Sequence, residues 1–367
     1  MNFKFDIAEA IKTVFLGIFA STKSKFSIDD FIAKEFHEIG FRDYFNNSFK
    51  NQILQVENLR IFNLKIIKIT TITMIFLLGI VFYQQKIKHN FASFASIIFC
   101  AVIFLANHLN QNFIKIYEQV FMQKFFNFFG ENIIYKKDGA SLVKRYEEFS
   151  VLPNFDSTIS KTSNLIYGKV KNNFFNLQEV ELFNKNIIQK KNPKFKKSDK
   201  AQMHNRGIAE FVEIEKITKI ARGLVIIIDL PKKFTSHTVL KKTGFRAKND
   251  YNPDPQNLEK ILTGNRDFDK KFKTYSNYSI ELNHDLTTSF IEKFIGVADL
   301  FKNKFMSAGF CENSFLIYLE TSHRLFEPSQ LYQQLNLVSE SKKIINALNI
   351  IFESADNLQK NFGASAV

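Results

Sequence analysis

The sequence contains no tryptophan and only two cysteines among its 367 residues. Cys100 and Cys311 lie far apart in the chain. They therefore predict neither a disulfide framework nor a metal site, and they fit a reducing compartment. Phenylalanine, in contrast, occurs 43 times. We interpret stripes of phenylalanine as a result of this composition and of core filling.

The sequence also lacks the motifs that bind phosphate groups or metal ions. Neither the Walker pattern nor GxGxxG occurs, and no serine lies in a Gly-x-Ser-x-Gly elbow. The seven histidines fall singly, without a His-Glu-x-x-His pair. We therefore predict no catalytic, cofactor-binding or metal-binding residues, and no cofactor.

Two positions are weak candidates for chemistry. Asp229 ends the most apolar strand of the chain, and Glu281, His284 and Asp285 form its densest ionisable group. A single acid without a partner favours a structural role, in which Asp229 hydrogen-bonds the following turn. Asp285 is explained more simply as the cap of a helix that begins near Leu286.

The formal charge is +14, which raises the question of nucleic acid. The lysines are dispersed among 36 acidic residues, and no nucleic-acid fold signature occurs, so we expect no nucleic-acid partner. An anionic membrane leaflet is a sufficient partner for this charge, because it attracts lysines at about 1 kcal/mol each.

Long apolar runs dominate one stretch of the chain. Residues 69–83 and 91–109 carry no formal charge, and the bend between them is polar. Such runs predict a transmembrane helical hairpin over residues 66–109, with Tyr83 as an interfacial aromatic. The alternative is a buried hairpin in a soluble core. A signal peptide is disfavoured because Asp6 and Glu9 precede the first apolar part.

The basic residues near the spans predict the orientation. Only two lysines lie in the bend, whereas six basic residues flank the spans on the other side, which places both termini in the cytoplasm. The bend carries Lys86 and Lys88, and the flanks carry Lys50, Arg60, Lys65, Lys68, Lys115 and Lys124.

Periodicity predicts an α+β fold around the hairpin, with a mostly antiparallel sheet. Helices are expected at 5–19, from Ser27 onward, and at 111–129, 142–149, 258–262, 286–305 and 327–358. The first of these either lies on the membrane surface or packs on the soluble domain. Strands are expected at 167–172, 174–183, 223–230 and 315–320, with 234–241 pairing back on the 223–230 strand.

Residues 184–200 are rich in lysine and contain Pro193. We interpret them as a solvated loop, with lipid headgroup contact as the alternative. The candidates for lipid contact in the whole chain are Lys65, Lys68, Lys190, Lys191, Lys194, Lys196 and Lys197.

Several segments resemble a bacterial membrane family, the domain of unknown function 3137. The resemblance covers about residues 121–352. It is carried by residues 167–170, 177–182, 221–234, and 267–276 followed by 286–294, with Thr274 and Thr288 where the family pattern has Val and Pro. It implies a helix ahead of two transmembrane helices, a cytoplasmic α+β domain, an inner-membrane location and no assigned catalytic residues.

These observations together predict four parts. They are a helical segment at 1–65, the hairpin at 66–109, a connecting helix at 110–130 and a cytoplasmic α+β domain at 131–367. We expect a non-catalytic binding or scaffolding module that contacts anionic headgroups or a cytoplasmic protein. The alternative is a membrane-tethered enzyme with a site near Asp229 and His284. Two spans enclose a transport pathway only in a homo-oligomer.

Overall fold

The computed structural model describes residues 7–22, 41–44, 47–48, 50–84, 91–128, 132–139, 141–170, 173–191, 211–230, 233–234, 236–244, 255, 257–277, 286–301, 304–322, 324, 326, 330–333 and 348–353. The chain divides into two compact units. The first comprises residues 1–135 and 325–346, and the second comprises residues 136–324 and 347–367.

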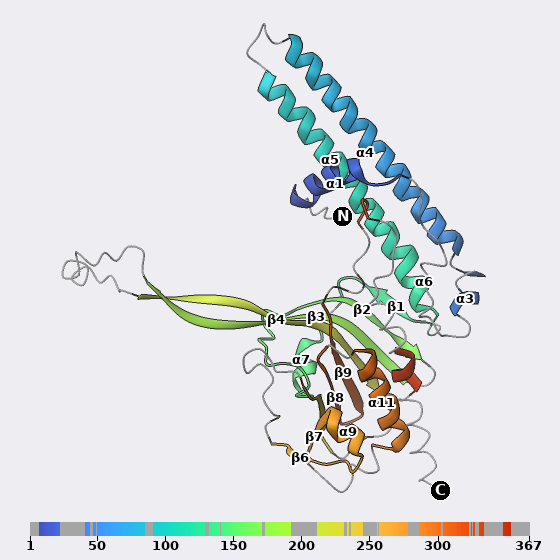
Figure 1. Ribbon diagram of the computed structural model, residues 1–367, viewed down its shortest axis with the longest axis vertical. Coiled ribbons are helices and arrows are strands. Elements are labelled where there is room, and N and C mark those ends of the chain that lie inside the picture. Colours follow the sequence, from blue (N-terminus) through green and yellow to red (C-terminus); the bar gives the residue numbers. More distant parts are fainter. Residues whose placement is uncertain are drawn as a thin grey trace, which may run out of the picture. The chain divides into compact units, whose positions relative to one another are not determined.

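The first unit is helical. Its main elements are α1 (Ile7–Phe19), α3 (Phe41–Tyr44), α4 (Lys50–Gln84) and α5 (Phe91–Tyr117). Helix α5 continues through a π-helical turn, η2 (Glu118–Met122), into α6 (Gln123–Phe126). This confirms the helix expected at 111–129 as far as Phe126. Helices α4 and α5 lie side by side, and α1 contacts both (Figure 1). The helix predicted from Ser27 lies outside the described residues.

The second unit is built on an antiparallel sheet, as expected. Its strands are β1 (Ile134–Lys136, at the boundary of the units), β2 (Lys161–Val170), β3 (Asn173–Lys191), β4 (Phe211–Asp229), β5 (Thr238–Lys242), β6 (Glu259–Ile261), β7 (Phe272–Ser276), β8 (Met306–Cys311) and β9 (Ser314–Glu320). Their order across the sheet is β1-β2-β3-β4-β9-β8-β5-β7-β6. Short helices α7 (Val143–Glu147) and α9 (Arg266–Lys271) and the longer α11 (Thr288–Leu300) accompany the sheet.

The centre of the sheet is buried on both faces, as its apolar run predicts. Residues 224–228 of β4 are each at most 1% exposed. Because side chains alternate along a strand, Val225 and Ile227 join one core cluster together with Tyr318. On α11, Phe290 packs its ring 5.6 Å from that of Phe315, the β9 partner of Ile228.

Four expectations about secondary structure and strand pairing were wrong. Residues 259–261 form the edge strand β6, because pairing with β7 outweighs the helical spacing of so short a segment. Strand β5 pairs with β7 and β8 rather than with β4. The N-cap of α11 is Thr287, whose side chain accepts a hydrogen bond from the Phe290 amide, rather than Asp285. Residues 330–333 form a turn, so the helix expected at 327–358 is present only at 348–353 among the described residues.

A fifth expectation, about the lysine-rich segment, was also wrong, and it matters for function. Residues 184–191 are not a loop but the far half of β3, paired with residues 211–218 of β4. Cross-strand pairing over this length overrides the polar composition. Beyond Leu182, β3 and β4 pair with each other and, among the described residues, with no other strand, so they leave the sheet as a two-stranded ribbon (Figure 1).

Candidate functional surfaces

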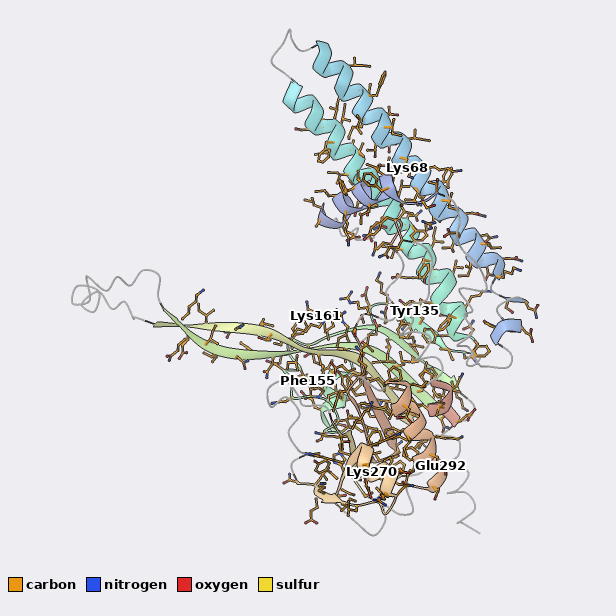
Figure 2. The ribbon with its side chains drawn as sticks, viewed as in Figure 1. Lys68, Tyr135, Phe155, Lys161, Lys270 and Glu292 are labelled. Atoms are coloured by element: carbon orange, nitrogen blue, oxygen red, sulfur yellow. The ribbon has the colours of Figure 1, made fainter. Side chains whose placement is uncertain are left out.

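The outer surface of α4 and α5 is apolar. Two helical stretches, Lys50–Ile80 and Ser96–Phe126, are long and apolar enough to cross a membrane by length and composition. Large apolar side chains of both helices point away from the protein (Figure 2). The exposed members in the apolar runs are Ile69, Ile72, Ile75, Phe76, Leu77 and Ile80 on α4 and Ile97, Phe99 and Phe104 on α5, and Leu54 and Phe62 are exposed nearer the start of α4.

The amino-terminal half of α4 differs because it carries charged residues. Glu57 and Arg60 form a bidentate ion pair with two 2.7 Å hydrogen bonds, and both side chains are almost completely buried. The Lys65 side chain is exposed. The half-buried Lys68, labelled in Figure 2, donates from Nζ to the Ala20 carbonyl at 2.6 Å. Lys68 is the last charged residue before the apolar half, so the helix changes character there.

The β3–β4 ribbon, residues 184–191 with 211–218, is the second unusual surface. Directly paired residues of an antiparallel ribbon share a face. Ile188 pairs with Ile214 on one face, whereas Ile187 and Ile217 lie on the other. All four isoleucines are exposed. The ribbon therefore presents apolar side chains to solvent on both of its faces.

Charged residues flank these isoleucines. Lys185 pairs with Glu215 across the ribbon at 2.7 Å. Lys190 and Lys216 are exposed. Of the remaining lipid-contact candidates, Lys191 ends β3, and the others lie outside the described residues: Lys194, Lys196 and Lys197.

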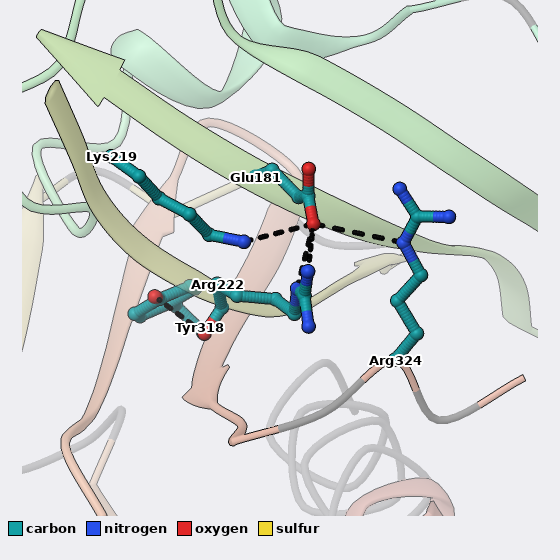
Figure 3. A network of polar contacts seen from close by, with 5 residues as sticks. All are labelled: Glu181, Lys219, Arg222, Tyr318 and Arg324. Atoms are coloured by element: carbon teal, nitrogen blue, oxygen red, sulfur yellow. Dashed lines mark hydrogen bonds and ion pairs between the residues drawn. The ribbon is translucent and has the colours of Figure 1, made fainter. Parts of the chain in front are cut away.

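A cluster of polar side chains around Glu181 lies at the base of the ribbon, where β3 and β4 leave the sheet (Figure 3). The Glu181 Oε1 atom accepts hydrogen bonds from Lys219, at 2.9 Å, and from Arg222, and Arg324 lies 3.6 Å away. Burial alone raises the pKa of Glu181, but the hydrogen bonds from Lys219 and Arg222 outweigh it and lower the pKa to about 2. The cluster joins β3 to β4 beside the bulge at Leu182 and Phe183.

Asp229 is also held in an ion pair. Its Oδ1 atom accepts a hydrogen bond from Arg145 at 2.8 Å and another from the Ser314 hydroxyl at 2.7 Å. Ser314 is the β9 partner of Asp229 in the sheet. Sequence reasoning missed both partners, because they lie 84 and 85 residues away in the chain. His284 lies outside the described residues, so the second half of the alternative site is not seen.

A cavity of about 470 Å³ opens beside α7 in the second unit. Its lining includes Tyr146, Glu147 and the buried Lys241, but not Asp229. The Tyr146 hydroxyl donates to Gln178 at 2.8 Å, and burial raises the pKa of this tyrosine. Among the residues that the structure describes, no group of three or more His, Cys, Asp or Glu side chains could hold a metal ion.

Residues 219–360 match the model of a family described as "Protein of unknown function (DUF3137)". The match confirms the resemblance to this family over these residues, whereas the sequence motifs suggested it over about residues 121–352. No match is found among curated proteins. The crystal structure of the mycobacterial trehalose monomycolate transport factor A, TtfA, aligns with 60% of this chain and 86% of its own, at 9% identity and a TM-score of 0.33. A score this low supports no conclusion about fold or function.

Proposed function

We propose that this chain is an integral membrane protein whose helices α4 and α5 cross the bilayer as a hairpin. The observation that carries the proposal is the outward-facing apolar surface of the two helices. Only 22% and 39% of their most apolar windows are buried. A core helix of a soluble protein is mostly buried, so water is an unfavourable solvent for this surface. Transferring one such side chain out of water contributes about 1.5–3 kcal/mol.

The lengths fit a bilayer. The charge-free part of α4, residues 69–84, rises about 24 Å at ~1.5 Å per residue. The exposed Lys65 has a stem long enough to reach the headgroups while Ile66 and Ile67 enter the apolar layer. This brings the span close to the ~30 Å hydrocarbon core. Helix α4 has 35 residues. Its half with the buried Glu57–Arg60 pair therefore lies outside the core.

The distribution of lysine and arginine gives the orientation. Both termini lie on the cytoplasmic side of a bacterial inner membrane, with residues 1–65 and 110–130 as helical segments next to the hairpin and residues 131–367 as the cytoplasmic α+β domain. A reporter fused after residue 367 should be active only in the cytoplasm. Activity of the same fusion in the periplasm would reverse the assignment.

The α+β part acts as a non-catalytic binding module, and the β3–β4 ribbon is its contact surface. The partner is an anionic membrane surface. A protein with one flat surface covers one face of the ribbon and leaves the isoleucines of the other face in water, whereas a headgroup layer surrounds an inserted ribbon on all sides. The exposed Lys190 and Lys216 add attraction of about 1 kcal/mol each near anionic lipid.

The test uses the full-length chain reconstituted in nanodiscs of zwitterionic lipid and mixed with liposomes. Co-sedimentation should require anionic lipid in the liposomes and should weaken at high salt. Replacing Ile187, Ile188, Ile214 and Ile217 with threonine keeps β-branching and should abolish binding. The control Leu262→Thr removes an exposed apolar side chain outside the ribbon and should leave binding unchanged. Equal binding by both variants would refute the role of the ribbon.

A further inference from the structure

On helix α1 the small or polar side chains face the protein and the large apolar side chains face outward. This is the reverse of a helix whose outer face meets water. The residues that face the protein are small or polar: Ala10, Thr13 and Gly17 are the buried residues of α1. A Cβ atom on Gly17 would lie 3.5 Å from Ile67 and 3.7 Å from Leu64, so α1 approaches α4 closely there. Small residues at helix contacts are typical of helices packed within lipid.

The opposite face of α1 carries its large apolar side chains. Phe15 and Phe19 are 63% and 74% exposed. Their rings are in edge contact with a centroid distance of 5.6 Å. The charged residue on this face is Lys12, and the exposed apolar residues are Ile7, Ala8, Ile11, Phe15, Leu16 and Phe19. A helix at a water surface shows the reverse pattern.

The contacts of α1 also fix its level along α4. Its carboxyl end is held where the Ala20 carbonyl accepts the Lys68 ammonium, and Gly17 lies beside Leu64 and Ile67. Lys68 is the residue at which α4 changes from charged to charge-free. If α4 spans the bilayer, α1 lies at the boundary between headgroups and acyl chains.

The polar edge of α1 is held within the same unit. The Glu9 carboxylate accepts a hydrogen bond from the Tyr332 hydroxyl at 3.1 Å, and the Lys12 ammonium lies 5.5 Å from the centre of the Tyr332 ring. These contacts fix the rotation of α1 about its axis, so Phe15 and Phe19 stay turned away from the protein.

We propose that α1 is an interfacial helix whose exposed face is immersed in lipid at the headgroup boundary. The inference rests on the proposed membrane crossing of α4 and α5, which brings lipid to this level in any case. Lipid is therefore the occupant of the exposed face.

The absence of tryptophan from the chain gives a clean test. Three single-tryptophan variants of the full-length chain are placed in nanodiscs whose lipids carry bromine at a shallow or a deep acyl position. Phe15→Trp reports on α1, Ile75→Trp on the exposed apolar face of α4, and Phe174→Trp on an exposed site of the sheet. All three replace exposed side chains, so the fold tolerates the change.

We expect shallow bromines to quench Phe15→Trp most strongly, deep bromines to quench Ile75→Trp most strongly, and neither to quench Phe174→Trp. If Ile75→Trp is quenched and Phe15→Trp is not, α1 does not meet lipid, although the crossing of α4 stands. If neither is quenched, the membrane crossing itself is wrong and the inference fails with it.

Discussion

Replacing Glu181 with glutamine should destabilise the sheet at the base of the ribbon by about 2 kcal/mol at neutral pH. The pKa of Glu181 lies at about 2 instead of the ordinary 4.5. A shift of this size corresponds to at most about 3–4 kcal/mol of stabilisation, at ~1.4 kcal/mol per pKa unit. The Glu181 side chain is 14% exposed but its cationic partners are 25–42% exposed. Solvent screening therefore lowers the expected value.

The pH dependence of this contribution has a definite sign. Because the pKa of Glu181 is lower in the folded protein than in the unfolded chain, its contribution is fully present above about pH 4.5 and is lost as the pH falls toward about 2. The difference in stability between the native chain and Glu181→Gln should therefore be largest near pH 7 and should shrink below pH 4.5.

Two assays on the full-length chain in mild detergent measure this effect. At pH 7, hydrogen exchange of peptides from β3 and β4 should be about 30-fold less protected in Glu181→Gln, since ~1.4 kcal/mol is a factor of ten. Urea unfolding at pH 7 and pH 3 gives the pH dependence. Glu259→Gln, an exposed carboxylate on β6, is the control and should change neither measurement. The reasoning fails if Glu181→Gln matches this control, or if its effect is the same at pH 3 and pH 7.

Further predictions follow from buried contacts. Gly223→Ala should destabilise the sheet by about 1–3 kcal/mol, because a Cβ there would lie 2.3 Å from the Tyr318 ring. The alanine variant should unfold at lower urea, and an unchanged midpoint would contradict the packing. Glu57→Leu should cost about 3–5 kcal/mol by leaving Arg60 buried without its partner, whereas Glu57→Leu combined with Arg60→Met should restore most of that loss. Thermal unfolding in detergent compares the single variant with the double variant. An equal loss of stability in both would argue against the buried pair.

Local patterns in the sequence predicted many of the helices and strands. The apolar run at 223–230 predicted a strand where β4 ends, and the periodicity of 286–305 predicted the helix α11. Strand order was not predictable, since β5 pairs with two strands that are distant in the sequence. The length of the ribbon was also missed, because Lys190 and its neighbours suggest a loop until β4 is seen beside them.

The candidate surfaces were predicted less well for the same physical reason. The partners of Glu181 come from segments 38, 41 and 143 positions along the chain, a juxtaposition that only the folded sheet creates. The stripe of Ile7, Ile11 and Phe15 was visible as a helical periodicity. Periodicity gives the stripe but does not say what covers it, and the packing of Gly17 against α4 shows only that the stripe faces away from α4.

Labelling of Cys100 tests the membrane crossing most directly. This cysteine lies in the apolar run of α5 with its side chain exposed. A charged, water-soluble maleimide does not enter hydrocarbon, because moving a charge out of water is costly. In open membrane fragments of a Cys311→Ser chain, a water-soluble maleimide should leave Cys100 unmodified until detergent is added. A cysteine placed at the exposed Asn51 of α4, in a chain with both native cysteines replaced by serine, should react at once. If Cys100 reacts without detergent as fast as the cysteine at position 51, water surrounds α5 and the membrane crossing is contradicted.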